Sequence, residues 1–266
     1  MGLARNLGHA AMQAAEVLFP PACPICREEV GSAEMLCPSC WKGVAFLAQT
    51  GCVTCARPIP GMLPDEHLTC DDCTRHPPVW RRGAAAFQYT ETGRRLVLAL
   101  KHGDRLDLAP MLGAWAFRAG RELVSGADLV APVPLHWSRR LKRRANQAAV
   151  LAASICRKAS RREAYAPRLL LRTTRTESQD GKNRAARTAN ISGAFVPGPD
   201  AANLANKRVL LVDDVLTTGA TLNEAARICL QNGAASVDIL VLALVVSEEY
   251  PYMVAAPEDE DDHEES

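Results

Sequence analysis

Apolar and polar positions alternate in blocks along the last two thirds of the chain, from about residue 83 onward. Apolar runs predict strands at 84–89, 128–133, 208–212 and 237–246. Alanine-rich stretches predict helices at 146–158 and 222–232. Strands that alternate with helices are typical of a parallel sheet with flanking helices. We therefore expect an α/β domain over 83–250, with its ligand beyond the carboxyl ends of the strands.

The first third of the chain lacks this pattern and contains eight of the ten cysteines. They form four Cys-x-x-Cys pairs: Cys23/Cys26, Cys37/Cys40, Cys52/Cys55 and Cys70/Cys73. A two-residue spacer lets both sulfurs of a turn face one ion, and two pairs complete a tetrahedral site with no position left for water. We therefore expect two structural zinc ions in a double zinc ribbon over 20–80. A short polar segment of this kind needs the metal in order to fold.

Two alternatives for the cysteines stay open at this point. Disulfides would use the same residues, but no secretory segment is evident, and in a reducing cytoplasm metal binding is the favoured use of such pairs. The pairs can also share their ions in sequence or in an interleaved order, and the sequential order is the simpler. The segment 1–19 is interrupted by polar residues, so we expect a short amphipathic packing helix there, and neither a signal peptide nor a membrane span.

The loop that follows the third predicted strand has the composition of an anion site. Asp213 and Asp214 come directly after the apolar run 209–212, where their carboxylates can accept hydrogen bonds from vicinal hydroxyls. A small turn rich in hydroxyl groups then enters a helix: Thr217, Thr218, Gly219, Ala220 and Thr221. Free amides and the dipole at a helix N-terminus attract anions, and a glycine lets the backbone approach phosphate oxygens. A ligand with a ribose-like diol next to a phosphate is implied. An ordinary helix-capping turn would explain the threonines and the glycine but not two carboxylates.

Residues 209–221 resemble the 5-phosphoribosyl 1-pyrophosphate (PRPP) motif of type I phosphoribosyltransferases at each of thirteen positions. The chain as a whole, over about 20–246, is similar to the ComF family of competence proteins, in which cysteine pairs precede such a domain. Further shared segments are Leu100-Lys101, Val133-Pro134-Leu135, Arg143-Arg144, Asn146-Gln147, Arg175-Thr176 and Gly193-Ala194-Phe195. The resemblance implies a type I phosphoribosyltransferase-like sheet preceded by a zinc-ribbon module.

The resemblance also implies roles for residues outside the motif. The segment 131–144 corresponds to a pyrophosphate-binding loop, in which Pro134, Arg143 and Arg144 would contact the donor. The polar segment 173–191 corresponds to a flexible catalytic loop that carries Lys182 and Arg184, unless it is an ordinary exposed connection. Asp213 and Asp214 would hold the ribose diol, and Mg²⁺ would bind together with PRPP.

Charge points to phosphate-bearing partners without naming one. The net charge is +1, but residues 258–265 hold seven carboxylates, so the rest of the chain carries +8. We expect the acidic segment 251–266 to be disordered. The implied activity is phosphoribosyl transfer to a nitrogen acceptor in a cytoplasmic protein with a role in DNA uptake. The alternative is a non-catalytic competence protein that senses the ligand or binds single-stranded DNA.

Overall fold

A computed structural model of the chain describes residues 20–32, 34–47, 51–63, 66–102, 105–135, 146–173 and 193–246. The helix expected over 1–19 and the disorder expected over 251–266 lie outside these ranges. In the described part of the chain, no helix is both long and apolar enough to cross a membrane.

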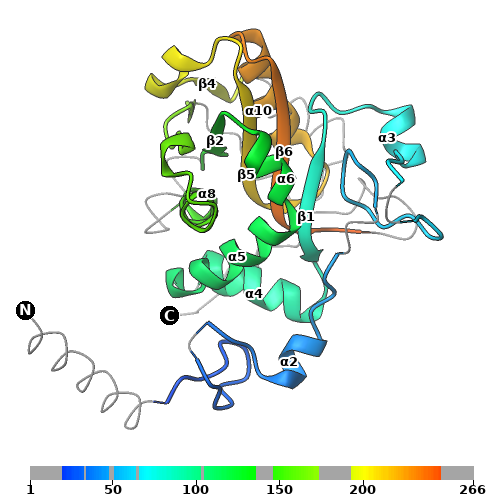
Figure 1. The fold of residues 1–266 in the computed structure, drawn as a ribbon, viewed down its shortest axis with the longest axis vertical. Coiled ribbons are helices and arrows are strands. Elements are labelled where there is room, and N and C mark those ends of the chain that lie inside the picture. Colours follow the sequence, from blue (N-terminus) through cyan, green and yellow to red (C-terminus); the bar gives the residue numbers. More distant parts are fainter. Residues whose placement is uncertain are drawn as a thin grey trace, which may run out of the picture.

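The core of the molecule is a parallel four-stranded sheet in the order β1-β6-β5-β2 (Figure 1). Its strands are β1 (Gly83–Gln88), β2 (Leu129–Pro132), β5 (Arg208–Leu216) and β6 (Ser236–Leu244). All but the first residue of β6 are buried, which is typical of a strand covered on both faces. The expected fold class, a parallel sheet with flanking helices, is confirmed.

Helices cover both faces of the sheet, and an apolar core lies on each face. One core joins α4 (Glu91–His102), α5 (Ala109–Ala119), α6 (Arg121–Gly126) and α8 (Gln147–Lys158) to one face of the sheet. The other joins α10 (Ala220–Gln231) and the antiparallel pair β3 (Leu170–Arg172) and β4 (Phe195–Pro197) to the opposite face. Along β5, Leu210 and Val212 belong to the first core and Val209 and Leu211 to the second, as the two-residue period of a strand requires.

Short helical turns complete the described elements. Three 3₁₀ turns are η1 (Leu106–Leu108), η2 (Arg162–Ala164) and η3 (Pro199–Asn203), and the cysteine-bearing region holds α2 (Pro38–Lys42) and α3 (Asp71–Arg75). Local sequence explains where the long helices begin. Asn146 caps α8 by accepting the amide hydrogen of Ala148 at 3.1 Å, and Gly219 precedes α10 in a left-handed conformation.

Strand β5 is longer than the sequence pattern indicates, and this changes the position of the two aspartates. The apolar run ends at Val212, so a strand end was expected there, but β5 continues to Leu216 because it stays paired with β6 up to Leu244. Strand β2 ends earlier, with Pro132 beside Val212. Asp213 and Asp214 therefore lie inside β5, in the part that extends past the end of β2.

The two cysteine-bearing segments pack against opposite faces of the sheet. Cys23 and Cys37 belong to the core of α4, α5 and α8, whereas Cys52, Cys55 and Cys73 belong to the core of α10. The segment after α2 also runs along the free edge of β1, where the Leu47 amide donates to the Ala86 carbonyl at 3.0 Å. In Figure 1, α2 and α3 accordingly lie far apart, at the bottom and on the right of the view.

Candidate functional site

The turn between β5 and α10 forms a small hollow. It has a volume of about 40 Å³, enough for roughly three water molecules, and its lining comprises Asp213 and residues 215–222. Gly219 adopts a φ of 73°, a conformation that disfavours any residue with a side chain, and as the N-cap of α10 it offers no side-chain acceptor of its own; the Ala220 amide donates to Thr218 Oγ1 at 3.4 Å. The helix N-terminus and a carboxylate thus line one hollow, which suits a ligand that carries both a phosphate and hydroxyl groups.

Asp213 lies on the α10 face of β5 and resists ionisation. Burial, together with the negative charge of Asp214, raises the pKa of its carboxyl from 3.8 to about 7. The Asp214 amide, which donates to Asp213 Oδ1 at 2.8 Å, and the positive charge of Lys101 act in the opposite direction. A cation or a set of hydroxyl donors at this site would favour the ionised form of Asp213.

Asp214 points to the other face of the sheet because it follows Asp213 in a strand. Its Oδ2 lies 3.5 Å from Lys101 Nζ, and the two side chains are 14% and 20% exposed. Lys101 is near the end of α4, and the Gln147 side-chain amide at the start of α8 donates to the Lys101 carbonyl at 3.4 Å. The two aspartates, expected to act together on one diol, therefore differ in their surroundings.

Strand β2 brings the start of the expected pyrophosphate loop to the same end of the sheet. The Val133 amide donates to the Val212 carbonyl at 2.9 Å, directly before the two aspartates. The Asn146 side chain holds the Val133 carbonyl at 3.2 Å. Pro134 follows Val133 directly, and the segment 136–145 lies outside the described residues. Pro132 is the last residue of β2, where the strand is still paired with β5. Arg143 and Arg144 lie outside the described residues.

The expected catalytic loop, with Lys182 and Arg184, also falls outside the described residues, but its flanks are described. The Thr173 amide donates to the Ala194 carbonyl at 3.1 Å, which extends the pairing of β3 and β4 by one further hydrogen bond. The Gly193 amide donates to Glu224 Oε1 on α10 at 2.7 Å. Both ends of this segment are therefore anchored on the face of the sheet that carries the hollow.

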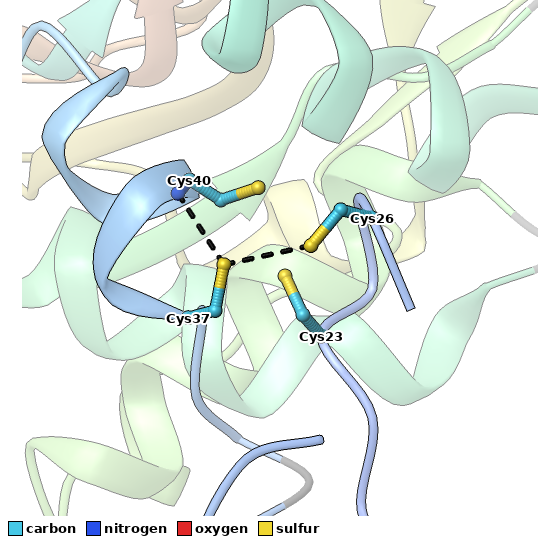
Figure 2. Close-up of side chains that lie close together, drawn as sticks. All are labelled: Cys23, Cys26, Cys37 and Cys40. Carbon is cyan, nitrogen blue, oxygen red and sulfur yellow. Dashed lines mark hydrogen bonds between the residues drawn. The ribbon is translucent and has the colours of Figure 1, made fainter. Parts of the chain in front are cut away.

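The eight paired cysteines form two clusters in the sequential arrangement. Cys23, Cys26, Cys37 and Cys40 form the first cluster (Figure 2), and Cys52, Cys55, Cys70 and Cys73 form the second; within each, the sulfur atoms lie within 4.8 Å of one another. Two Sγ–Sγ distances are 3.5 Å (Cys26 to Cys37) and 3.7 Å (Cys55 to Cys70). A tetrahedron of sulfurs bonded to zinc at about 2.3 Å has edges of about 3.8 Å, so both clusters fit a zinc ion.

Backbone amides solvate the sulfurs, as a thiolate site requires. The Cys40 amide donates to Cys37 Sγ at 3.5 Å, and the Cys70 amide donates to Cys52 Sγ at 3.2 Å. No disulfide bond joins any of the ten cysteines, all of which lie in the described part of the chain, so the disulfide alternative is wrong. The two unpaired cysteines, Cys156 and Cys229, are buried in helices, where burial raises their pKa to about 11 and about 12. They are packing residues.

Comparison with protein families assigns both parts of the molecule. A double zinc ribbon domain matches residues 14–74, and a phosphoribosyl transferase domain matches residues 145–262. This chain joins a double zinc ribbon to a phosphoribosyl transferase domain. Strand β1, helices α4 and α5 and strand β2 precede the second match in sequence, but the two outer strands β1 and β2 complete the sheet of the phosphoribosyl transferase domain.

The chain is similar to curated proteins over most of their length. The chain is 29% identical to the DNA utilization protein YhgH of Escherichia coli O6:H1 over 84% of this chain and 96% of that protein. It is 28% identical to competence protein F of Haemophilus influenzae, over 65% and 77% of the two chains. The expected resemblance to ComF proteins is confirmed. The allosteric regulatory enzyme of purine biosynthesis is similar in structure, with 16% identity and a TM-score of 0.40 over 61% of this chain and 34% of that enzyme.

Sequence reasoning did not predict the positions of two side chains that contact Asp214 and Gly219. Lys101 occurs in a segment shared with the ComF family, but its role depends on α4 bringing it to Asp214. Trp80 is the last residue of the segment expected to form the zinc ribbons and had no predicted role, yet it is 3% exposed and lies against Gly219. Trp80 follows the prolines Pro77 and Pro78, and no local sequence signal indicates that it is packed.

Proposed function

We propose that the phosphoribosyl transferase domain binds PRPP with Mg²⁺ at the hollow between β5 and α10 and transfers the phosphoribosyl group to a nitrogen acceptor. The observation that carries the proposal is that Asp213 and the N-terminus of α10 line one hollow. The 5-phosphate would accept hydrogen bonds from the amides of 218–221, and the ribose hydroxyls would donate to Asp213. Asp214 would hold the second hydroxyl once Lys101 releases it.

The reaction is a substitution at the anomeric carbon. The acceptor nitrogen donates its lone pair to this carbon, the bond to pyrophosphate oxygen breaks, and the electron pair leaves on pyrophosphate while the nitrogen loses a proton. The carboxylates of Asp213 and Asp214 would offset the positive charge that develops on the sugar. When bound, Mg²⁺ supplies charge neutralisation at the pyrophosphate.

Residues around the leaving group complete the proposed site. Pro134, beside the end of β2, would begin the loop that carries Arg143 and Arg144 to the pyrophosphate. Lys182 and Arg184 would approach from the segment anchored by β3 and β4, and their positive charge would favour departure of the pyrophosphate.

The zinc ribbons and the relatives support a role in DNA handling. Two described relatives are named for DNA utilization and competence. We propose that the product or the bound donor acts in such a process in the cytoplasm, and that the zinc-ribbon module connects the domain to partners in it.

The enzyme hypothesis is tested by pyrophosphate release. The protein is incubated with PRPP and Mg²⁺ and, in turn, with purines, pyrimidines and ammonia, and pyrophosphate is measured with a coupled assay. Release with at least one acceptor, abolished in Asp213→Asn, is expected. Donor binding without release from any nitrogen acceptor would contradict catalysis and leave a ligand sensor.

A nucleic-acid role is the second candidate, and exposed aromatic side chains favour it. Trp41 and Phe46 are 46% and 38% exposed, with ring centroids 4.7 Å apart. Both rings contact Trp115 of α5, with centroid distances of 5.5 and 5.0 Å. Exposed rings of this kind can also stack on bases, and nearby lysine and arginine residues can bind phosphates.

Salt dependence tests this second candidate. Affinity for single-stranded DNA should fall as salt rises, and replacing the five basic residues of 139–144 with alanine should reduce both affinity and salt slope. Trp41→Ala should weaken binding while leaving the salt slope unchanged. No binding at low salt would exclude this role.

A further inference from the structure

Trp80 lies between the second cysteine cluster and the turn that forms the proposed phosphate site. Its ring is buried, and its Nε1 donates to the carbonyl of Thr54 at 2.8 Å. Thr54 belongs to the Cys-x-x-Cys turn that provides Cys52 and Cys55. On the opposite edge of the ring, a Cβ added to Gly219 would lie 2.8 Å from Cη2. One side chain therefore contacts both the turn 52–55, which we call the cysteine turn, and Gly219, in the segment 217–221 that we call the phosphate loop.

The backbone on either side of Trp80 is held to the same two elements. The Val79 amide donates to Asn223 Oδ1 on α10 at 2.8 Å. The Gly83 amide donates to the Val53 carbonyl, in the cysteine turn, at 2.9 Å. Between these contacts, the Arg81 amide donates to the Val237 carbonyl of β6 at 2.8 Å. The ring thus has a fixed position relative to both the cluster and the helix.

Among the described residues, no side chain connects the first cysteine cluster to the phosphate loop in the same way. Its buried cysteines, Cys23 and Cys37, pack into the core that α4, α5 and α8 form on the other face of the sheet. The second cluster shares a core with Trp80, Leu216 and Leu222, and the last two also line the hollow. The two zinc ribbons are therefore not equivalent with respect to the phosphate loop.

We propose that Trp80 is a positioning residue for the phosphate loop and that the second cysteine cluster, unlike the first, holds the loop in its anion-binding form through Trp80. A helix N-terminus binds phosphate well when its amides are already oriented, because no ordering cost then remains at binding. Gly219 adopts a left-handed conformation with little conformational restriction of its own, so its orientation depends on local hydrogen bonds, such as that of the Ala220 amide to Thr218 Oγ1, and on the residues packed against it. Trp80 provides that support. The ligand identity in this inference rests on the proposed function, but the support of the loop does not.

Hydrogen exchange of the loop amides tests the inference without a ligand. In Trp80→Phe, which loses the bond to Thr54 but keeps an aromatic ring, the amides of 218–221 should exchange about fivefold faster or more, while those of β6 stay protected. Trp41→Phe, a tryptophan change in the first ribbon, is the matched control and should leave both regions unchanged. Equal exchange of the loop in both variants and the wild type would overturn the inference, as would an equal increase in the loop and in β6.

Ligand removal from each cluster tests the asymmetry. Cys70→Ser and Cys26→Ser each remove one of the less buried ligands of one cluster. In zinc-loaded protein, Cys70→Ser should speed exchange at 218–221 and Cys26→Ser should not. Equal effects of the two variants on the loop would overturn the asymmetry. If Cys70→Ser does not fold, the comparison of loop exchange in Trp80→Phe and Trp41→Phe decides whether the two ribbons differ in their effect on the loop.

Binding of PRPP with Mg²⁺ separates this inference from the proposed function. The dissociation constant should rise about three- to tenfold in Trp80→Phe and remain unchanged in Trp41→Phe. If wild-type protein does not bind PRPP but loop exchange still depends on Trp80, the proposed function fails and the inference stands. If PRPP binds equally to all three proteins and loop exchange is also equal, the inference fails and the proposed function stands.

Discussion

A carboxyl group that is withdrawn from water beside a second carboxylate binds its proton more tightly, and Asp213 is such a group. Its pKa of about 7 in the folded protein exceeds the ordinary 3.8, so the folded state retains a proton that the unfolded state loses. The free energy of unfolding should therefore fall as pH rises from about 4 to about 7.

Asp213→Asn should abolish this loss of stability, because an amide has no charge but can still accept the Asp214 amide hydrogen. We expect a gain of about 1–4 kcal/mol at pH 8 and little change near pH 4. Urea denaturation of wild type and variant at pH 8 and pH 4 measures the change in the free energy of unfolding.

Asp128 offers a control of opposite sign. Hydrogen bonds from Arg208 lower the pKa of Asp128 to about 2, so its ionised form stabilises the folded state above about pH 4 and that contribution is lost as pH falls towards 2. Asp128→Asn should reduce stability at pH 8, whereas Asp213→Asn should increase it. A loss of stability at pH 8 in both variants would contradict the assignment of a raised pKa to Asp213.

The positive charge of Lys101 stabilises the ionised forms of Asp213 and Asp214. Lys101→Met should destabilise the protein by roughly 1–3 kcal/mol at pH 8, since it leaves Asp214 with less compensation in a mostly buried position. It should also raise the pKa of Asp213 further, because Lys101 opposes the shift. Lys158→Met is the matched control: Lys158 lies 3.9 Å from Glu34 in an exposed pair, and such pairs contribute little. Equal stability losses in the two variants would show that the Lys101 contact has no special weight.

The turn from β5 into α10 is the element in which local sequence and tertiary packing meet. Gly219→Ala places a methyl group in a left-handed conformation and against the ring of Trp80. Gly61→Ala imposes a similar φ, 77°, with nothing within 4 Å of the added Cβ. We expect Gly61→Ala to cost about 1 kcal/mol and Gly219→Ala to cost at least twice that, with loss of PRPP binding. Thermal denaturation of the two variants gives the difference, and equal costs would contradict the packing of Trp80 under the turn.

The same elements show how far sequence reasoning reaches. The period of apolar positions predicted β2, β6, α8 and α10 to within two residues, because a buried element has apolar side chains at a regular spacing along the sequence. The end of β5 was misplaced because Asp213 and Asp214 interrupt the apolar run while pairing with β6 continues. Strands β3 and β4 are three residues each, too short for a periodic signal.

The residues of the candidate site also differ in whether the sequence alone could predict them. Residues 213–221 were identifiable because one contiguous segment provides the hollow. Lys101 and Trp80 were not, because they reach this segment from α4 and from the chain before β1, and only the fold brings them there. Spacing alone also left the grouping of the cysteine pairs open, and the three-dimensional clusters resolve it.

At the scale of the whole molecule, the two zinc ribbons are parts of the cores on the two faces of the sheet. Removal of zinc should therefore destabilise the phosphoribosyl transferase domain as well as the ribbons. We expect a chelator to lower the melting temperature of the described core by several degrees, since about 1 kcal/mol corresponds to about 2–4 °C in a chain of this size. Circular dichroism with and without chelator, and after zinc is restored, measures this. A β-sheet transition at an unchanged temperature would show that the ribbons are energetically separate.

The central claim is that the turn between β5 and α10 binds a phosphoribosyl donor, and calorimetric titration with PRPP and Mg²⁺ tests it most directly. Wild-type protein should bind one PRPP per chain, and the double variant Asp213→Ala, Asp214→Ala should remain folded and zinc-loaded but bind none. Binding of equal affinity by wild type and double variant, or no binding by zinc-loaded wild type at pH 8, would contradict the claim.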